Sequence, residues 1–424
     1  MTNQRGDPRG GIADEGIPGP IIEMRSVPLG APAVRRKRVA RLLGSLTVQA
    51  LLIVAATRLP LFGLSWYTLR AVPRLDFYPA QLPDAFLPAT LWLDGWARWD
   101  TAHYVAVAMH GYGDAANLSH DGGLGFFPLF PLLMRWSVQL TGMALSEARL
   151  AVAAVVLANA CFLAAVPLFA RLMARRFGAD VARTATLLLC VSPFSLFFSA
   201  GYSESLFLLL VLLAFVAADR GWWLAAAVCA AFLTATRLVG LALPPALLLL
   251  AWRRGASTRD LVVTALVSPL GVAGYALYTW RAFGDPLAYF TAQANWGGWD
   301  EHVRFYAELF AGSPREALLG DPRHLVIVLN LALATLWLAS LPAVWRRLDP
   351  GVALFTTLMV VLHVAMTWVS LGRYLLVAIG FYPVAALLLT RPGWRGWPRD
   401  LVVVGSTLLL AMLTILFAHG FWVV

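Results

Sequence analysis

The sequence predicts an all-α protein that crosses a membrane many times. Of its 424 residues, 60% are apolar and only 13% are charged, which leaves too little polar surface to cover a water-soluble globule. The apolar residues form a series of long runs, and a membrane-spanning helix needs about 20 such residues. Arginines cluster between these runs, where helix ends are expected, so hydropathy and charge indicate the same class.

The formal net charge of +10 does not indicate a nucleic-acid-binding protein. The basic residues are scattered among the ends of the apolar runs and are not gathered on one soluble face. We attribute them to membrane orientation and to contact with anionic lipids, and we expect no nucleic-acid partner. The cysteines, Cys161, Cys190 and Cys229, lie inside apolar runs without metal-ligand spacing and are interpreted as buried thiols.

Two regions of the chain are predicted. Residues 1–38 are expected to form a disordered basic tail, because Gly, Pro and charged residues dominate them without a helical or strand period. The basic cluster at residues 35–38 places this tail in the cytoplasm by the positive-inside rule. Residues 39–424 are expected to form one polytopic domain whose first apolar run is retained as a spanning helix.

About eleven spanning helices are predicted from the apolar runs and the positions of the arginines. In this arrangement the arginine-rich turns fall on the cytoplasmic side, and two long loops, 64–147 and 284–322, fall outside. The run 126–140 is too short to span and contains two prolines and an arginine, so we interpret it as interfacial or re-entrant. Its boundaries are soft, as are those of 222–252, which Arg237 divides into two short helices. The expected spans are 42–62, 149–170, 182–199, 204–218, 222–236, 238–252, 260–281, 323–345, 351–369, 374–390 and 400–420.

The first long loop, which is expected to carry short amphipathic helices, contains the pattern most typical of a site. Asp100 stands in a segment rich in Trp, His and Tyr, and a Pro-kinked aromatic run follows. An acid among aromatic residues at a membrane surface is a place where a polar substrate can meet a lipid. An interfacial aromatic belt with a solvated acid is the alternative from composition alone. Asp94 is expected to be a solvated loop acid. The residues expected to line the cleft are Trp96, Arg98, Trp99, His103, Tyr104, His110, Tyr112, Phe127 and Pro128.

Ionisable residues within or at the ends of spans are further site candidates, because burying a charge in a membrane is costly. Glu204, Arg237 and Arg373 are all predicted at the outer ends of spans, with Tyr202 and Tyr374 beside them. An ion pair between Arg237 and Glu204 is the structural alternative to a binding role. A carboxylate can act as a general base, and guanidinium groups can neutralise a departing phosphate. The set therefore suits transfer from a phosphorylated lipid.

The motifs also follow one another in a recognisable order. The Ser-Pro pair and the run Phe-Ser-Ala-Gly-Tyr-Ser-Glu-Ser-Leu at 198–206 are the most specific of them. Together they resemble the PIG-V-type mannosyltransferases, related to GPI mannosyltransferase 2, within the GT-C glycosyltransferases. The residues that carry the resemblance are Arg98, Trp99 and Asp100; His110, Gly111 and Tyr112; Phe127, Pro128 and Pro131; Ser192 and Pro193; Phe198 to Leu206; Arg237 and Gly240; and Arg373 and Tyr374.

This resemblance implies a GT-C-like bundle that uses a polyprenyl-phosphate sugar, with mannose as the expected sugar and the catalytic acid at Asp100. The donor phosphate is expected at Arg237 and Arg373. The segment between Tyr112 and Phe126 matches no motif of the family. The Arg-rich composition and the tail favour a bacterial protein, which would have no GPI precursor as acceptor, so the acceptor, a lipid, glycan or protein, stays open.

Two functions follow as hypotheses. The first is an inverting glycosyltransferase of the cell membrane, in this interpretation a bacterial inner membrane, with an extracytoplasmic site. No His/Cys cluster indicates a metal or other cofactor, although the acidic loops leave a weakly bound divalent cation open. The second is a lipid or sugar transporter or flippase. Against it, the candidate residues gather at one membrane face and not at the midplane of paired broken helices.

Overall fold

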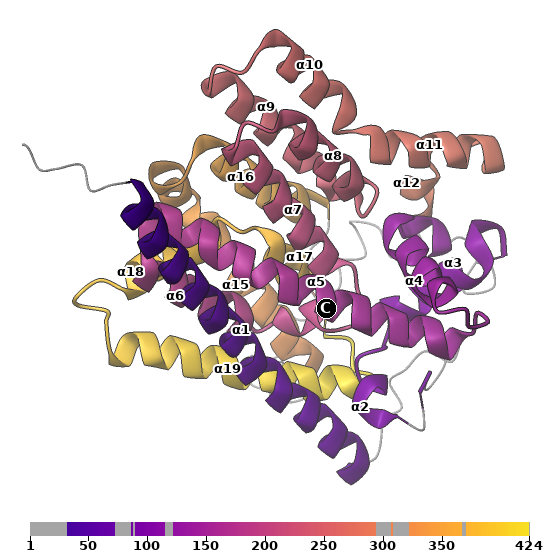
Figure 1. Cartoon of the computed structure of the whole chain (residues 1–424). Helices are drawn as coiled ribbons and strands as arrows, with labels where there is room; N and C mark the ends of the chain where they lie inside the picture. The colour runs from indigo at the N-terminus through magenta and orange to yellow at the C-terminus, as the bar shows by residue number, and fades with distance from the viewer. Residues whose placement is uncertain are drawn as a thin grey trace, which may run out of the picture. The chain divides into compact units, whose positions relative to one another are not determined.

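The computed structural model describes residues 32–72, 86–87, 90–114, 122–293, 307, 322–366 and 370–423. These residues form helices and no strands (Figure 1). The chain divides into a unit of residues 1–42 and a unit of residues 43–424. The site and all contacts given below lie in the second unit.

Five helical segments of the described chain are long and apolar enough to cross a membrane. A sixth is obtained if α17 (Leu371–Tyr374) with η6 (Leu375–Val377) and α18 (Phe381–Leu389) are counted as one span bent by 86°. The all-α, polytopic class is therefore confirmed. The five segments lie in α1 (Pro32–Ala71), in α5 (Glu147–Phe177), in α10 (Thr258–Val267) with α11 (Leu270–Phe283), in α15 (Pro322–Arg347) and in α19 (Trp397–Ala418).

The other expected spans are helical but short, so length and composition support five or six spans where about eleven were expected. The Ser-Pro step at 192–193 ends one helix, and the break at Arg237 divides another. α7 packs against α5 and α8 and is almost wholly buried by protein. The shorter helices are α6 (Ala179–Val191), α7 (Glu204–Asp219), α8 (Trp223–Thr234), η4 (Leu238–Ala242), α9 (Leu243–Arg253) and α16 (Pro350–Met366).

The expected loops differ from the structure at their ends. α1 begins inside the range expected as a tail and continues to Ala71, beyond the expected exit near residue 63. The first loop then carries α2 (Leu91–Asp94), α3 (Asp100–Asp114), η2 (Gly122–Gly125) and α4 (Leu129–Leu140). At 12 residues α4 is too short to span. Of the second loop, only α12 (Ala288–Gln293) and its flanks are described, with Ala307, and residues 1–31 also lie outside the described part.

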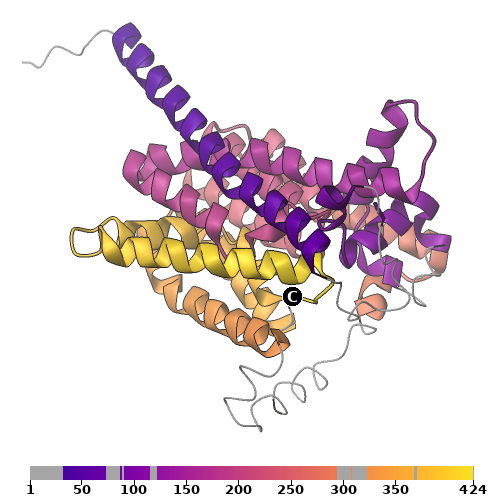
Figure 2. The ribbon, with the colours of Figure 1, turned by 90° about the horizontal axis from the view of Figure 1, so that it is seen from below.

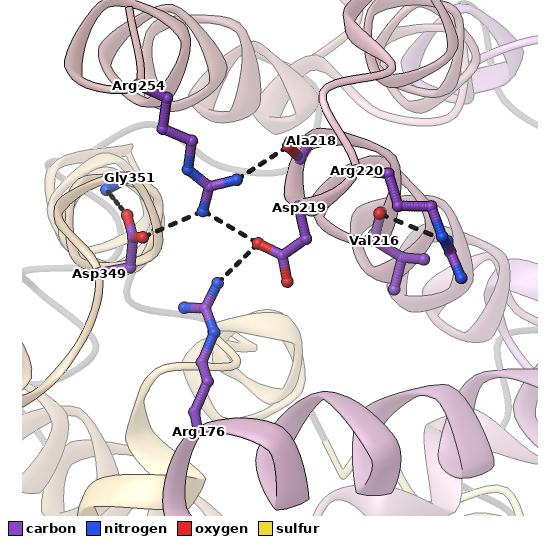
Figure 3. A network of polar contacts seen from close by, with 8 residues as sticks. All are labelled: Arg176, Val216, Ala218, Asp219, Arg220, Arg254, Asp349 and Gly351. Atoms are coloured by element: carbon purple, nitrogen blue, oxygen red, sulfur yellow. Dashed lines mark hydrogen bonds and ion pairs between the residues drawn. The ribbon is translucent and has the colours of Figure 1, made fainter. Parts of the chain in front are cut away.

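An ion-pair network joins four helix ends on the side of the second unit that the arginine pattern assigns to the cytoplasm (Figure 3). Asp219 at the end of α7 lies 3.0 Å from Arg176 of α5 and 2.9 Å from Arg254 after α9. Arg254 also lies 3.2 Å from Asp349, just before α16. Glu204 begins α7 at the opposite end, about 22 Å away at 1.5 Å per residue. The network therefore fixes the C-terminal end of α7, while the N-terminal end of α7 carries the candidate site.

Candidate active site

Four charged residues predicted from the sequence come together at the start of α7. An Asp100 carboxylate oxygen lies 2.8 Å from a terminal nitrogen of Arg373. The Nε of Arg373 lies 2.9 Å from Glu204 Oε1, and the same oxygen lies 2.6 Å from a terminal nitrogen of Arg237. We call Asp100, Arg373, Glu204 and Arg237 the charged array. Acids and arginines alternate along it, and the two acids balance the two arginines, so the array is electrically neutral.

The two ends of the charged array are more accessible than its middle. The side chains of Asp100 and Arg237 are 16% and 17% exposed, whereas those of Arg373 and Glu204 are 6% and 1% exposed. A ligand can therefore reach Asp100 and Arg237 first, while Glu204 contacts both arginines from inside the protein. The ion pair between Arg237 and Glu204 foreseen as an alternative is present and does not remove Arg237 from the accessible surface.

A turn of unusual backbone geometry presents Asp100. Trp99 has a φ of 51°, in the left-handed region that non-glycine residues rarely adopt. Its indole nitrogen donates to the carbonyl oxygen of Phe421 at 3.2 Å, and its ring stacks on Trp422 at 5.9 Å between centroids. The backbone N–H of Asp100, which starts α3, donates to the Tyr202 hydroxyl at 3.2 Å. The tertiary contacts of both residues hold the acid at a helix start.

Close backbone approach explains the glycine of the segment before Glu204. The Gly201 N–H donates to the Trp96 carbonyl at 2.9 Å, and the Thr101 hydroxyl donates to the Gly201 carbonyl at 3.3 Å. A Cβ at Gly201 would lie 2.9 Å from two side-chain atoms of Thr101, which is too close for an ordinary contact. The small residue lets the segment before α7 lie against the start of α3, which brings Glu204 near Asp100.

The two arginines occupy helix breaks and lie over aromatic rings. Arg237 has extended backbone between α8 and η4, and Arg373 lies in the short α17. The Arg373 guanidinium lies 4.7 Å from the ring centroid of Tyr374 and 5.0 Å from that of Tyr202, and Arg237 lies 4.5 Å from the Tyr374 ring. Such cation–π contacts orient a guanidinium without competing for its N–H donors. Sequence-predicted Tyr202 and Tyr374 therefore position the arginines.

Aromatic side chains of α3 and the run after η2 form a wall beside Asp100. The His103 ring stacks on Phe126 at 4.7 Å, and Tyr104 meets the same ring edge-on at 5.0 Å. The Tyr104 hydroxyl lies 2.9 Å from the Ser203 hydroxyl. Burial lowers the pKa of His103 below its ordinary 6.5, and the nearby Asp100 carboxylate opposes this shift. His103 is therefore neutral at pH 7.

A second aromatic group was only partly foreseen. The Phe127 ring lies 4.7 Å from Tyr275 and 5.2 Å from Tyr289, and Tyr112 lies 5.4 Å from Tyr275. The Tyr112 hydroxyl donates to the Phe126 carbonyl at 2.6 Å. Tyr275 and Tyr289 come from α11 and α12 and were not singled out from the sequence. In the sequence, only the aromatic content around the outer end of the 260–281 span indicated that Tyr275 and Tyr289 could belong to the site.

Three residues near Asp100 have a supporting position and do not line a cleft. Trp96 is fully buried and stacks on Phe62 at 4.4 Å. A terminal nitrogen of Arg98 pairs with Asp94 at 2.7 Å, and its Nε donates to the Ala418 carbonyl at 3.1 Å. The expectation that Asp94 is a solvated loop acid is wrong, because it is fully buried and also accepts from the Leu87 N–H at 3.0 Å.

The remaining predicted residues lie at the margin. His110 is exposed near the end of α3, and Pro128 is the half-buried residue before α4. Among the described residues, no three His, Cys, Asp or Glu side chains lie close enough to hold a metal ion. The acidic loop segments for which a weakly bound divalent cation was left open include residues outside that part of the chain.

Comparisons with known proteins agree with the order of the motifs. Residues 45–246 match the model of the family described as mannosyltransferase (PIG-V). GPI alpha-1,6-mannosyltransferase 2 of Rattus norvegicus is 36% identical over 155 residues, which are 35% of this chain and 29% of that protein. The Homo sapiens protein of the same name is 32% identical over 154 residues, 35% of this chain and 30% of that protein. The matches thus span under a third of these relatives' length, and the resemblance to PIG-V-type mannosyltransferases is confirmed over this region.

A solved structure was also found to be similar. It is ArnT from Cupriavidus metallidurans bound to undecaprenyl phosphate, with a TM-score of 0.48 and 15% sequence identity. The alignment covers 88% of this chain and 76% of that chain. Asp100, Glu204 and Arg237 lie within the family match, whereas Arg373 lies beyond it.

Proposed function

We propose that this chain, whose residues 45–246 carry the PIG-V mannosyltransferase signature, is a membrane glycosyltransferase. It moves mannose from a polyprenyl-phosphate donor to the hydroxyl group of an extracytoplasmic lipid, glycan or protein acceptor, with inversion. One observation carries the proposal: an accessible carboxylate, Asp100, lies 2.8 Å from Arg373 in an array that also presents Arg237.

Asp100 is the general base of the proposed reaction. It takes the proton of the acceptor hydroxyl while that oxygen attacks the anomeric carbon of the sugar. The bond between the anomeric carbon and the phosphate oxygen breaks, and the phosphate leaves with the electron pair. A single displacement of this kind inverts the anomeric centre. The 16% exposure of the Asp100 side chain leaves it open to a substrate.

Arg237 and Arg373 neutralise the leaving phosphate, because guanidinium groups form charge-assisted hydrogen bonds with phosphate oxygens. In the structure Arg373 also pairs with Asp100. A donor phosphate beside the arginines would compete with the Asp100 carboxylate for the N–H groups of Arg373. Donor binding would thus free Asp100 to accept the proton of the acceptor, with Glu204 holding both arginines in place.

The aromatic residues shape the space around the sugar. Trp99, His103, Tyr104 and Tyr112 are proposed to line this space, and Tyr289, whose ring contacts that of Phe127, is proposed to join them. Trp96 and Arg98 support the turn from inside and are assigned no contact with substrate. The protein would act in the cell membrane with its site on the extracytoplasmic face, opposite the network at Asp219.

The test is transfer by purified protein in detergent, with a labelled polyprenyl-phosphate mannose and a membrane lipid extract as source of acceptor. We expect Asp100→Asn to keep the fold and to reduce turnover about 10²- to 10⁴-fold, the usual contribution of a general base. Glu147→Gln is the matched control, because Glu147 is an exposed acid in the first turn of α5.

Asp94→Asn is unsuitable as the control because Asp94 is buried and paired with Arg98. Turnover of Asp100→Asn within about threefold of wild type across pH would remove Asp100 as the base. A lipid or sugar transporter, the alternative function, would form no new glycoside with either variant.

A further inference from the structure

A long apolar cavity lies on the side of the unit formed by α15, α18 and α19, and no residue of the charged array lines it. Its volume is about 470 Å³, within the roughly 300–1,000 Å³ of small-molecule sites. Figure 2 shows α15 and α19 running along the same face. The lining runs along α15 from Leu333 to Arg347, about 21 Å at 1.5 Å per residue. The cavity is thus an elongated groove.

Cationic side chains line one end of the groove only. Arg347, the last residue of α15, and Arg391, which follows α18, are the charged residues of the lining, and no acid of the described residues lines it. Neither arginine forms an ion pair with an acid of the described residues, whereas nearby Arg395 pairs with Asp180 at 2.8 Å. The end of the groove at Arg347 and Arg391 therefore carries two positive charges that have no ion-pair partner among the described residues.

The groove is open to the outer surface of the helices. Leu336, Leu388 and Val402 line it and are exposed, as is Trp394 beside the arginines. In a membrane these exposed apolar side chains face lipid, and Trp and Arg are typical of the interface with the headgroups. The groove is somewhat longer than about 15 Å, half of the roughly 30 Å hydrocarbon core. Its length thus matches a lipid of one leaflet.

We propose that this groove is a binding site for one anionic phospholipid, with its phosphate headgroup at Arg347 and Arg391 and an acyl chain along α15 and α18. Basic pockets between spanning helices on the cytoplasmic side recognise anionic headgroups in this way. The acyl chain would contact Phe381 and Tyr382, directly after the 86° bend that joins α18 to the segment of Arg373. The site is separate from the proposed transfer reaction.

The experiment compares binding of phosphatidylglycerol and phosphatidylcholine to delipidated full-length protein by native mass spectrometry. We expect phosphatidylglycerol to bind more tightly, and the double variant Arg347→Ala/Arg391→Ala to lower its affinity about tenfold or more. Arg253→Ala/Arg346→Ala is the matched control. It removes two exposed arginines that are absent from the groove lining, and its affinity should stay within about twofold of wild type.

A second variant tests the groove without changing charge. Ala385→Phe places a ring in the middle of the lining and should reduce phosphatidylglycerol binding while the arginines remain. Equal binding of both lipids, or equal loss in the two arginine doubles, would show ordinary boundary lipid and overturn the proposal. Displacement of phosphatidylglycerol by polyprenyl phosphate that is abolished by Arg373→Ala would assign the groove to the donor tail and would also overturn it.

Discussion

Glu204 gives the sharpest test of how the charged array is built. Its Oε1 atom lies 2.6 Å from Arg237 and 2.9 Å from Arg373, and its side chain is only 1% exposed. Glu204→Gln keeps the size of the side chain but leaves two arginines without their shared counter-charge. Removing one partner of a buried ion pair typically costs about 3–5 kcal/mol of stability. We expect this variant to lie in that range.

Arg237→Gln should cost less than Glu204→Gln. Arg237 is 17% exposed, so water screens part of its charge, and Glu204 retains Arg373 after the substitution. The double variant Glu204→Gln/Arg237→Gln removes both charges of one pair, and its loss should be smaller than the sum of the single losses by about 0.5–3 kcal/mol. A positive coupling of this size is the signature of a direct contact.

The measurement is thermal unfolding of the four proteins in one detergent, followed by tryptophan fluorescence and checked by size-exclusion chromatography. The control pair is Asp260→Asn and Glu147→Gln, a half-buried and an exposed acid in the first turns of α10 and α5. Additive effects of Glu204→Gln and Arg237→Gln, or a larger loss for Arg237→Gln, would refute the arrangement in which Glu204 is the buried centre of the array.

Three further predictions concern the donor, pH and orientation. Arg237→Ala and Arg373→Ala should each weaken donor use about ten- to a hundred-fold, and Arg373→Ala should also lower turnover because Arg373 contacts Asp100; unchanged kinetics of both would exclude them from the donor site. Because burial lowers the pKa of His103, the unfolded chain binds a proton at this residue at a higher pH than the folded protein does. Stability should therefore decline as pH falls below 6.5, and unfolding measurements should show a flatter decline for His103→Gln between about pH 7 and 5. An impermeant thiol reagent should label Met143→Cys but not Gly393→Cys in intact cells, with any outer membrane permeabilised, and the opposite pattern would reverse the topology.

The sequence predicted the charged array because two independent signals agreed. Acids and arginines in membrane proteins are costly enough to mark sites, and the arginine-rich turns assigned the ends of the spans to one side or the other. Asp100, Glu204, Arg237 and Arg373 were thereby expected on one face, and the structure brings them into contact. Their pairing order was not predictable, since it depends on side-chain geometry across four separate elements.

The errors came from residues whose partners are distant or unrecognised. Asp94 and Arg98 are four residues apart, the spacing of a helical ion pair, and this spacing is visible in the sequence. Nothing in the sequence of the turn between α2 and α3 indicated that both side chains are buried. Tyr289 meets Phe127 only because α12 folds back on the first loop. The apolar runs around Ser192 and Arg237 form short helices, so length and composition alone count five or six spans in the described residues where about eleven were expected.

The turn at Asp100 shows why the family-matched region does not contain the whole candidate site. A left-handed φ at a non-glycine residue such as Trp99 typically costs about 1–3 kcal/mol, so surrounding contacts must hold it. The Trp99 indole donates to the carbonyl of Phe421, just after α19, and neighbouring Arg98 donates to that of Ala418, the last residue of α19. Residues 45–246 thus contribute the proposed base, while the later half of the chain contributes both the contacts that fix its turn and Arg373, its ion-pair partner. The orientation of Asp100 therefore depends on the packing of α19 as much as on its own motif.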